Sequence, residues 1–100
     1  LPAISLTDPS VITALANDYS FKEVFSRQIQ ALGKSYDLII AFSTSGKSLP
    51  VLEGIRQAKK LGLDVIEWPR DKGKNTGEIQ EYQLKLIHQV FNEVKKYYGN

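Results

Sequence analysis

Residues 43–48 read STSGKS and carry four hydroxyl side chains and one lysine. They follow an apolar segment, 37–42, and precede an amphipathic segment, 49–61, so they lie between a predicted strand and a predicted helix. Ligands of parallel sheets bind at such junctions, where the free N–H groups of a helix N-terminus attract anions. The segment therefore predicts a phosphate site. In the simpler alternative, Ser48 only caps the helix and the preceding residues form a turn.

A nucleotide P-loop is a second kind of anion site that this segment partly matches. Gly46, Lys47 and Ser48 fit the end of the pattern Gly-x-x-x-x-Gly-Lys-Ser/Thr. Ala41 stands at its first glycine, however, inside the apolar segment, and no later strand ends in a metal-binding aspartate. A cradle for a phosphate monoester fits the serines better.

Two pairs of polar residues are further candidates. Asn17 and Asp18 lie between two short predicted helices, where they either bind sugar hydroxyls or only form a turn. His88 is the only histidine, and helical periodicity places it on a polar face, as expected of a solvated side chain. Gln80 lies eight residues earlier, about 12 Å along a helix. One straight helix cannot bring both to one ion, so they would serve different copies of a site.

The elements that position these residues alternate. We expect a strand at 3–6, and a helix that begins at Pro9 with Asp8 as its cap and ends at Asn17-Asp18. Ser20 and Glu23 form a capping box for a helix that ends at Gly33. The continuous apolar run 37–42 predicts a strand covered on both faces.

The second half continues with a helix at 49–61, closed by Gly62, a strand at 63–66, a loop at 68–77 and a long helix at 78–98. This order predicts a single α/β domain with a parallel sheet. The last helix is apolar over more than half of its circumference, which predicts an oligomer interface.

Composition narrows the class of protein. The chain has 100 residues, a net charge of +2, no Cys and no Met. The charge is too small to indicate a nucleic-acid binder, and the absence of Cys excludes disulfides and thiolate metal sites. No apolar segment is long enough to span a membrane, and no signal peptide is evident. The missing Met and the immediate strand pattern lead us to expect the interior of a longer chain.

The motif STSGKS, preceded by Asn17-Asp18 and by FSR at 25–27 and followed by EIQE at 78–81 and LIH at 86–88, resembles the sugar isomerase (SIS) domain family and, within it, the phosphoheptose isomerases. The resemblance implies a three-layer, flavodoxin-like sandwich in which helices flank a central parallel sheet. It covers residues 1 to about 94.

The resemblance implies the isomerisation of sedoheptulose 7-phosphate to D-glycero-D-manno-heptose 7-phosphate, in the cytoplasm, for the heptose of bacterial lipopolysaccharide. It implies a homotetramer with active sites at subunit interfaces, often with zinc, and neither a nucleic-acid nor a membrane partner. The roles implied are phosphate binding by Ser43, Thr44, Ser45 and Ser48, sugar binding by Asn17 and Asp18, substrate or metal binding by Gln80, and acid/base catalysis or metal binding by His88.

The sequence departs from the family in several places. The upstream phosphate loop Gly-Asn-Gly-Gly-Ser-Ala, and the helix with the catalytic Glu and a zinc-binding His, would precede Leu1. A further strand is absent near 66–67, so we expect an omitted internal segment. Lys47 replaces the usual Asn, and Gln83 stands where His is common. The alternative function is a non-catalytic SIS domain that binds a sugar phosphate or a replication initiator.

Overall fold

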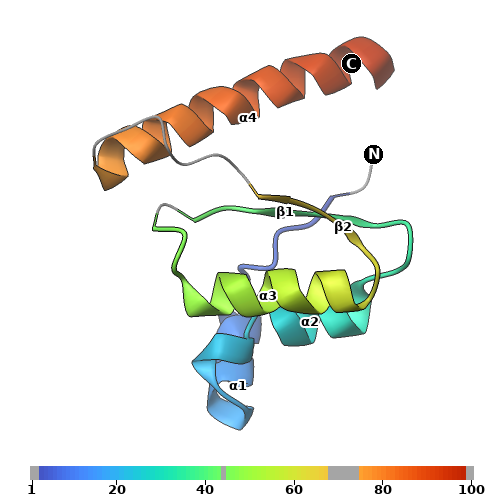
Figure 1. Cartoon of the computed structure of the whole chain (residues 1–100), viewed down its shortest axis with the longest axis vertical. Helices are drawn as coiled ribbons and strands as arrows, with labels where there is room; N and C mark the ends of the chain where they lie inside the picture. The colour runs from blue at the N-terminus through green and yellow to red at the C-terminus, as the bar shows by residue number, and fades with distance from the viewer. Residues whose placement is uncertain (1–2, 44, 68–74, 99–100) are drawn as a thin grey trace. The chain divides into compact units, whose positions relative to one another are not determined.

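The computed structural model of the chain describes residues 3–43, 45–67 and 75–98, with side chains as far as residue 96. Most of the predicted loop at 68–77 thus lies outside the described residues, as does Thr44. The chain divides into two compact units (Figure 1). The first contains residues 1–41 and 47–67, and the second contains residues 42–46 and 68–100.

The first unit confirms the parallel α/β class. Two strands pair in parallel, with Leu38 opposite Asp64 and Ala41 opposite Glu67. A helix connects them, as parallel pairing requires, because a tight turn cannot bring a strand back in the same direction. The elements of this unit are α1 (Pro9–Asp18), the 3₁₀ helix η1 (Phe21–Glu23), α2 (Ser26–Leu32), β1 (Leu38–Ala41), α3 (Leu49–Lys60) and β2 (Asp64–Glu67).

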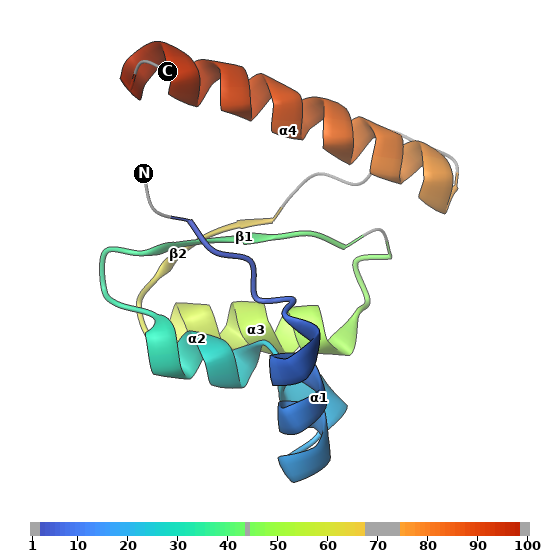
Figure 2. The same cartoon turned by 180° about the vertical axis from the view of Figure 1, so that it is seen from behind.

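The core of this unit lies between the sheet and two helices. Helices α2 and α3 pack against each other on one face of the sheet in both opposite views (Figures 1 and 2). Helix α1 packs on η1, and η1 packs in turn on α3. The buried residues Ile29, Ala58 and Leu63 form one hydrophobic cluster, against which Leu6, Ile39 and Val65 pack.

Strand β1 is covered differently from the expectation. Its residues alternate between exposed and half-buried, although the apolar run predicted cover on both faces. The helices α2 and α3 bury only Ile39 and its neighbour Val65 on β2. The other face remains apolar and exposed at Leu38 and Ile40, which are 50% and 41% accessible.

The predicted strand at 3–6 is wrong, since these residues have no regular secondary structure. A side chain binds this segment instead of a neighbouring strand. The buried amide of Gln28 donates from Nε2 to the carbonyl oxygen of Leu6 at 3.0 Å and to that of Val24 at 2.8 Å. The Leu6 side chain packs on the core. This apolar contact and the Gln28 amide together hold the segment in place.

Local signals set most helix boundaries. Asp8 caps α1 as predicted, because its Oδ1 accepts from the Ser10 hydroxyl at 2.7 Å and the Ser10 N–H at 2.9 Å. These hydrogen bonds lower the pKa of the Asp8 carboxyl. Helix α3 ends in a Schellman turn, in which Gly62 adopts a φ of 79° and the N–H of Leu63 donates to the Ala58 carbonyl.

The capping box at Ser20 and Glu23 is only partly confirmed. Ser20 precedes η1, but its side chain makes no capping hydrogen bond to the backbone. Its hydroxyl donates to the Glu23 carboxylate at 3.0 Å instead. The predicted single helix is accordingly divided into η1 and α2, which begins at Ser26.

The second unit contains the long helix α4, Thr76–Tyr98. It begins two residues before the predicted start because the Asn75 side chain accepts from the Glu78 N–H at 3.0 Å and caps it. No helix among the described residues is long and apolar enough to cross a membrane. Many apolar side chains of α4 are exposed, namely Leu84, Ile87, Val90 and Phe91.

Candidate functional site

Ser43 and Ser45 follow β1, and neither lies in regular secondary structure. The Ser43 hydroxyl oxygen accepts from the Gly46 N–H at 3.0 Å and lies 3.5 Å from the Ser45 hydroxyl. Gly46 has a φ of 67°, a conformation that side chains disfavour, which explains a glycine here. Thr44 lies outside the described residues. Because Ser43 accepts from the backbone, its O–H proton remains available to donate to an anion.

Ser48 precedes the first turn of α3 as predicted, but it does not cap the helix through its side chain. Its backbone carbonyl accepts from the Leu52 N–H at 2.9 Å, while its half-buried hydroxyl makes no capping bond. The alternative in which Ser48 serves as a side-chain cap is therefore wrong. Pro50 lacks an N–H, so one backbone donor fewer is available at this helix terminus.

Asn17 and Asp18 form the last turn of α1, and both side chains are exposed. The Asn17 amide donates to the Asp18 carboxylate at a long 3.4 Å. This weak contact within the pair leaves most of their hydrogen-bonding capacity facing solvent. Such an amide and carboxylate are suited to the hydroxyl groups of a sugar.

The residues that follow this pair form a network that the sequence analysis did not identify. The Arg27 guanidinium lies 3.9 Å from the ring centroid of Tyr19. The same side chain pairs with Glu23, to which Ser20 also donates. The i,i+4 spacing of Glu23 and Arg27 was a sequence signal for their contact, because such pairs face each other on a helix, and the capping-box spacing indicated that of Ser20 with Glu23.

Gln80 and His88 both lie on α4 and are exposed, and His88 lies on the polar side that periodicity predicted. Eight residues separate them, about 12 Å along the axis, whereas a histidine nitrogen binds zinc at about 2 Å. No group of three or more His, Asp or Glu residues that could hold a metal occurs in the described ranges. A single copy thus provides no zinc site there.

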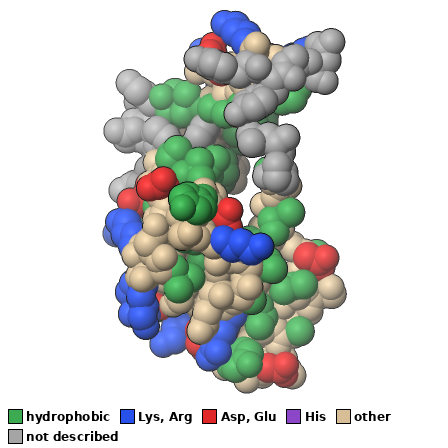
Figure 3. Space-filling view, turned by 90° about the vertical axis from the view of Figure 1, so that its right-hand side faces the viewer, with side chains coloured by type: hydrophobic (Ala, Val, Ile, Leu, Met, Phe, Trp, Pro, Cys, Tyr) green, Lys and Arg blue, Asp and Glu red, His purple; other side chains and the backbone are tan. Residues whose placement is uncertain are grey.

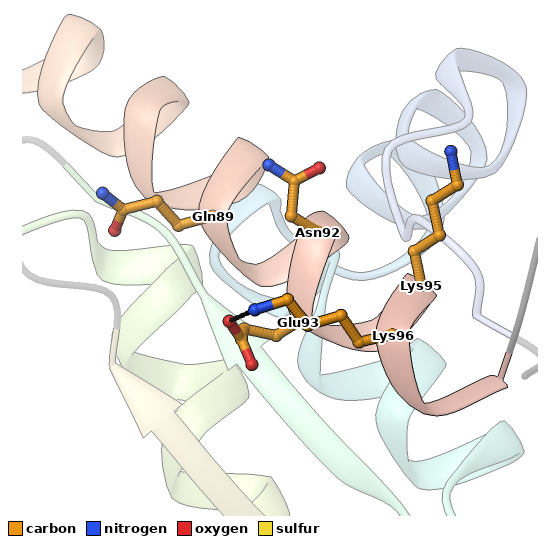
Figure 4. A pocket seen from close by; sticks show the side chains of 5 residues that line it. All are labelled: Gln89, Asn92, Glu93, Lys95 and Lys96. Carbon is orange, nitrogen blue, oxygen red and sulfur yellow. Dashed lines mark hydrogen bonds and ion pairs between the residues drawn. The ribbon is translucent and has the colours of Figure 1, made fainter.

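A shallow depression lies on the C-terminal half of α4 (Figure 4). All the residues that line it come from this one helix, and an ion pair of 3.2 Å joins Glu93 to Lys96 across it. None of the predicted site residues lines it, so it is not the candidate site. Its lining residues are Gln89, Asn92, Glu93, Lys95 and Lys96.

Acidic and basic side chains are interspersed on the face shown in Figure 3. This mixture agrees with the net charge of +2. The basic residue within the candidate site is Lys47, which is exposed. The candidate site therefore combines neutral hydroxyls with one cation beside them.

Comparisons with known proteins place these residues in a family context. The family profile described as "SIS domain" matches residues 1–67. The chain is 42% identical to the phosphoheptose isomerase of Campylobacter concisus over 94% of this chain and 58% of that protein. It is 51% identical to the enzyme of that name from Thermodesulfovibrio yellowstonii over 88% of this chain and 52% of that protein.

Solved structures agree with the sequence comparisons. The structure of a phosphoheptose isomerase from Neisseria gonorrhoeae superposes with a TM-score of 0.89 and 33% identity over 96% of this chain and 62% of that one. That from Francisella tularensis gives a TM-score of 0.82 and 30% identity over 90% of this chain and 57% of that one. The chain thus spans little more than half the length of the curated relatives it matches.

Proposed function

Because the chain belongs to the SIS-domain family, we propose that the intact protein isomerises sedoheptulose 7-phosphate to D-glycero-D-manno-heptose 7-phosphate. The names of the relatives support an isomerase, and the observation that carries the phosphate site is the Ser48 hydroxyl, which precedes α3 without capping it. We assign the reaction to the cytoplasm and to the synthesis of surface-polysaccharide heptose.

In the proposed mechanism, the serine hydroxyls hold the phosphate, remote from the reacting carbons. Ser43, Ser48 and the neighbouring Ser45 and Thr44 donate to its oxygens, which fixes the position of the sugar. Asn17 and Asp18 bind sugar hydroxyls. With the phosphate anchored, the reacting carbons of the substrate meet the same catalytic groups in each turnover.

The chemistry itself needs proton transfers between adjacent carbons and oxygens. A base removes a proton from C1 of the ketose to give an enediol, and the same proton is then delivered to C2. A second group moves a proton between the oxygens on C1 and C2. We assign one of these acid/base roles to His88, because histidine is the side chain most often used for proton transfer, and the other to a glutamate outside this chain.

We propose that the active sites are shared between subunits of a homotetramer. Leu84, Ile87, Phe91 and Val94 recur along α4 at spacings of three and four residues, the pattern of a helix that packs against another helix. The first three of them are exposed. Pairing of α4 with a second copy would bury this stripe and bring His88, on the adjacent face, beside another subunit.

Zinc has no part in the proton transfers proposed above. Since Gln80 and His88 of one copy cannot reach the same ion, any zinc that the protein holds requires ligands from a second copy or from residues outside the described ranges. We therefore propose that zinc binding, where it occurs, depends on assembly.

We also propose that this single SIS domain lacks an internal segment near 66–67. The alignment with the Helicobacter pylori phosphoheptose isomerase spans 116 positions but contains all of this 100-residue chain. At least 116 − 100 = 16 positions of that relative therefore have no counterpart here. The family profile ends at residue 67, where the omission was expected.

Replacement of His88 tests the proposed catalysis. We expect His88→Ala to reduce the conversion of sedoheptulose 7-phosphate by about 100-fold to 10,000-fold, the usual contribution of a general acid or base. Binding of the substrate should persist, because the phosphate and sugar contacts remain. The measurement is the rate of interconversion of the two heptose phosphates by the intact protein.

Gln89→Ala is the matched control, because Gln89 is the exposed neighbour of His88 on the same helix, and its activity should equal that of the wild type. Full turnover by His88→Ala would contradict the catalytic role. Substrate binding without any conversion by the wild-type protein would instead support the non-catalytic SIS domain.

A further inference from the structure

The turn after α1 is held by an aromatic ring and a guanidinium group. Tyr19, which directly follows Asn17 and Asp18, ends α1 with its N–H donating to the Leu15 carbonyl at 2.9 Å. Its ring is 54% exposed, but the Arg27 guanidinium carbon lies 3.9 Å from the ring centroid. At this distance the cation is attracted to the ring face.

Arg27 is itself held in place by Glu23. The Arg27 Nε and Nη2 atoms lie 3.2 Å and 3.1 Å from Oε1 of Glu23. The second carboxylate oxygen, Oε2, accepts from the Ser20 hydroxyl at 3.0 Å. Because Ser20 is the covalent neighbour of Tyr19, the four side chains form a closed circuit around the turn.

Both side chains of the Arg27–Glu23 ion pair are partly buried, whereas Arg56 in the pair with Glu53 is 76% exposed. The Arg27 and Glu23 side chains are 38% and 29% exposed, whereas those of Lys96 and Glu93 are 72% and 65% exposed. Electrostatic attraction between partly buried groups is screened less by salt and water. The Arg27–Glu23 pair therefore orients its neighbours more firmly than a fully solvated pair.

Two members of the circuit, Tyr19 and Ser20, directly follow Asp18 in the chain. Tyr19 departs from helical geometry with φ −124° and ψ −89°, and the side chains of Tyr19 and Ser20 are both bound into the circuit. The direction in which Asn17 and Asp18 project thus depends on contacts made by the residues that follow them. The contact between Asn17 and Asp18 themselves is too long, at 3.4 Å, to fix this direction.

We propose that Arg27 is a positioning residue for the sugar-binding pair Asn17 and Asp18. It acts through the ring of Tyr19 and the carboxylate of Glu23, and touches no substrate itself. This inference rests on the proposed function, since it takes Asn17 and Asp18 to bind the sugar. Its consequence is that loss of the guanidinium weakens substrate binding more than it slows turnover.

The test is a double-mutant cycle on the intact protein with sedoheptulose 7-phosphate as substrate. Arg27→Gln and Tyr19→Leu should each raise KM about tenfold and leave kcat within about twofold. The double variant should be no worse than either single variant, because both remove the same contact. Tyr19→Phe keeps the ring and Arg27→Lys keeps the charge, so both should restore much of the affinity.

Arg56→Gln is the matched control, because Arg56 also pairs with a glutamate, Glu53, but its own side chain is 76% exposed. It should leave KM unchanged. An unchanged KM in Arg27→Gln, an equal rise in Arg56→Gln, or additive effects in the double variant would each overturn the inference while the wild type remains active. A wild type that neither binds nor converts the substrate would overturn the proposed function, and this inference with it.

Discussion

At the scale of single residues, Ser48 precedes a helix but its hydroxyl makes no capping hydrogen bond, so the hydroxyl can bind a ligand. Serine before a helix normally accepts a backbone N–H, and its replacement by alanine then costs about 0.5–2 kcal/mol. Here the Ser48 hydroxyl makes no such bond. The backbone carbonyl alone begins the helix, through Leu52. The hydroxyl thus contributes to the proposed phosphate site without being required for α3.

Ser48→Ala should therefore weaken substrate binding while leaving the stability of the fold nearly unchanged. We expect the free energy of unfolding to fall by less than about 0.5 kcal/mol, because no capping bond is lost. A hydrogen bond to a charged group contributes about 1.5–3 kcal/mol, so KM for the sugar phosphate should rise about tenfold to a hundredfold. Chemical denaturation and steady-state kinetics measure the two effects.

Ser35→Ala, in an exposed turn before β1, is the control and should change neither quantity. A large loss of stability in Ser48→Ala would show that the hydroxyl caps the helix after all.

At the scale of elements, two glycines end helices for different physical reasons. Gly33 follows α2 in an extended conformation, φ −71° and ψ 135°, that any residue can adopt. A Cβ atom there would lie 2.7 Å from the Ile29 carbonyl oxygen and 2.8 Å from Leu63 Cδ1. Gly62 after α3 has open space around it but a φ of 79°. One glycine is required by packing and the other by backbone conformation.

Replacement by asparagine should change the stability of the fold differently at the two positions. Gly33→Ala should destabilise the fold by about 1–3 kcal/mol through overpacking, and Gly33→Asn by at least as much. Gly62→Ala should cost about 1–2 kcal/mol because of its left-handed backbone. Gly62→Asn should recover part of this loss, since asparagine tolerates that conformation.

Thermal and urea unfolding of the four variants measure these differences. Two results would contradict this assignment: a Gly33→Asn variant that is more stable than Gly33→Ala, or a Gly62→Asn variant that is no more stable than Gly62→Ala.

At the scale of the whole molecule, α4 exposes several large apolar side chains. Phe91 is 61% exposed and Leu84 55%. Exposed apolar side chains arranged along one stripe mark an interaction surface. In the proposed tetramer this stripe lies between copies, and the contribution of His88 to a shared site depends on that contact.

Phe91→Glu should consequently dissociate the assembly, because it places a charge within the apolar stripe. Analytical ultracentrifugation should show a smaller species, and isomerase activity and any bound zinc should be lost together with the assembly. Asn92→Glu adds the same charge on the polar side of α4 and should preserve all three. An intact assembly in Phe91→Glu would exclude this stripe as the interface.

The sequence by itself determined the features that arise from neighbouring residues. The order of the elements from β1 onward, the Asp8 cap, the turn at Gly62 and the position of the serine-rich segment between β1 and α3 were all predictable, because periodicity and capping act within a few residues. Two local predictions failed. The helix expected after Ser20 is divided into η1 and α2, and α4 begins two residues early, although Asn75 and Glu78 carried the capping signal.

Only the tertiary structure decided the features that depend on residues far apart in the chain. Residues 3–6 resemble a strand, but the Gln28 amide binds Leu6 from 22 positions away. The apolar run of β1 predicted two covered faces, but packing against α2 and α3 buries one. Three-dimensional geometry likewise determines the circuit of Tyr19 and Arg27 and the absence of a capping bond at Ser48. A residue type indicates what a side chain can bind, whereas packing decides what it does bind.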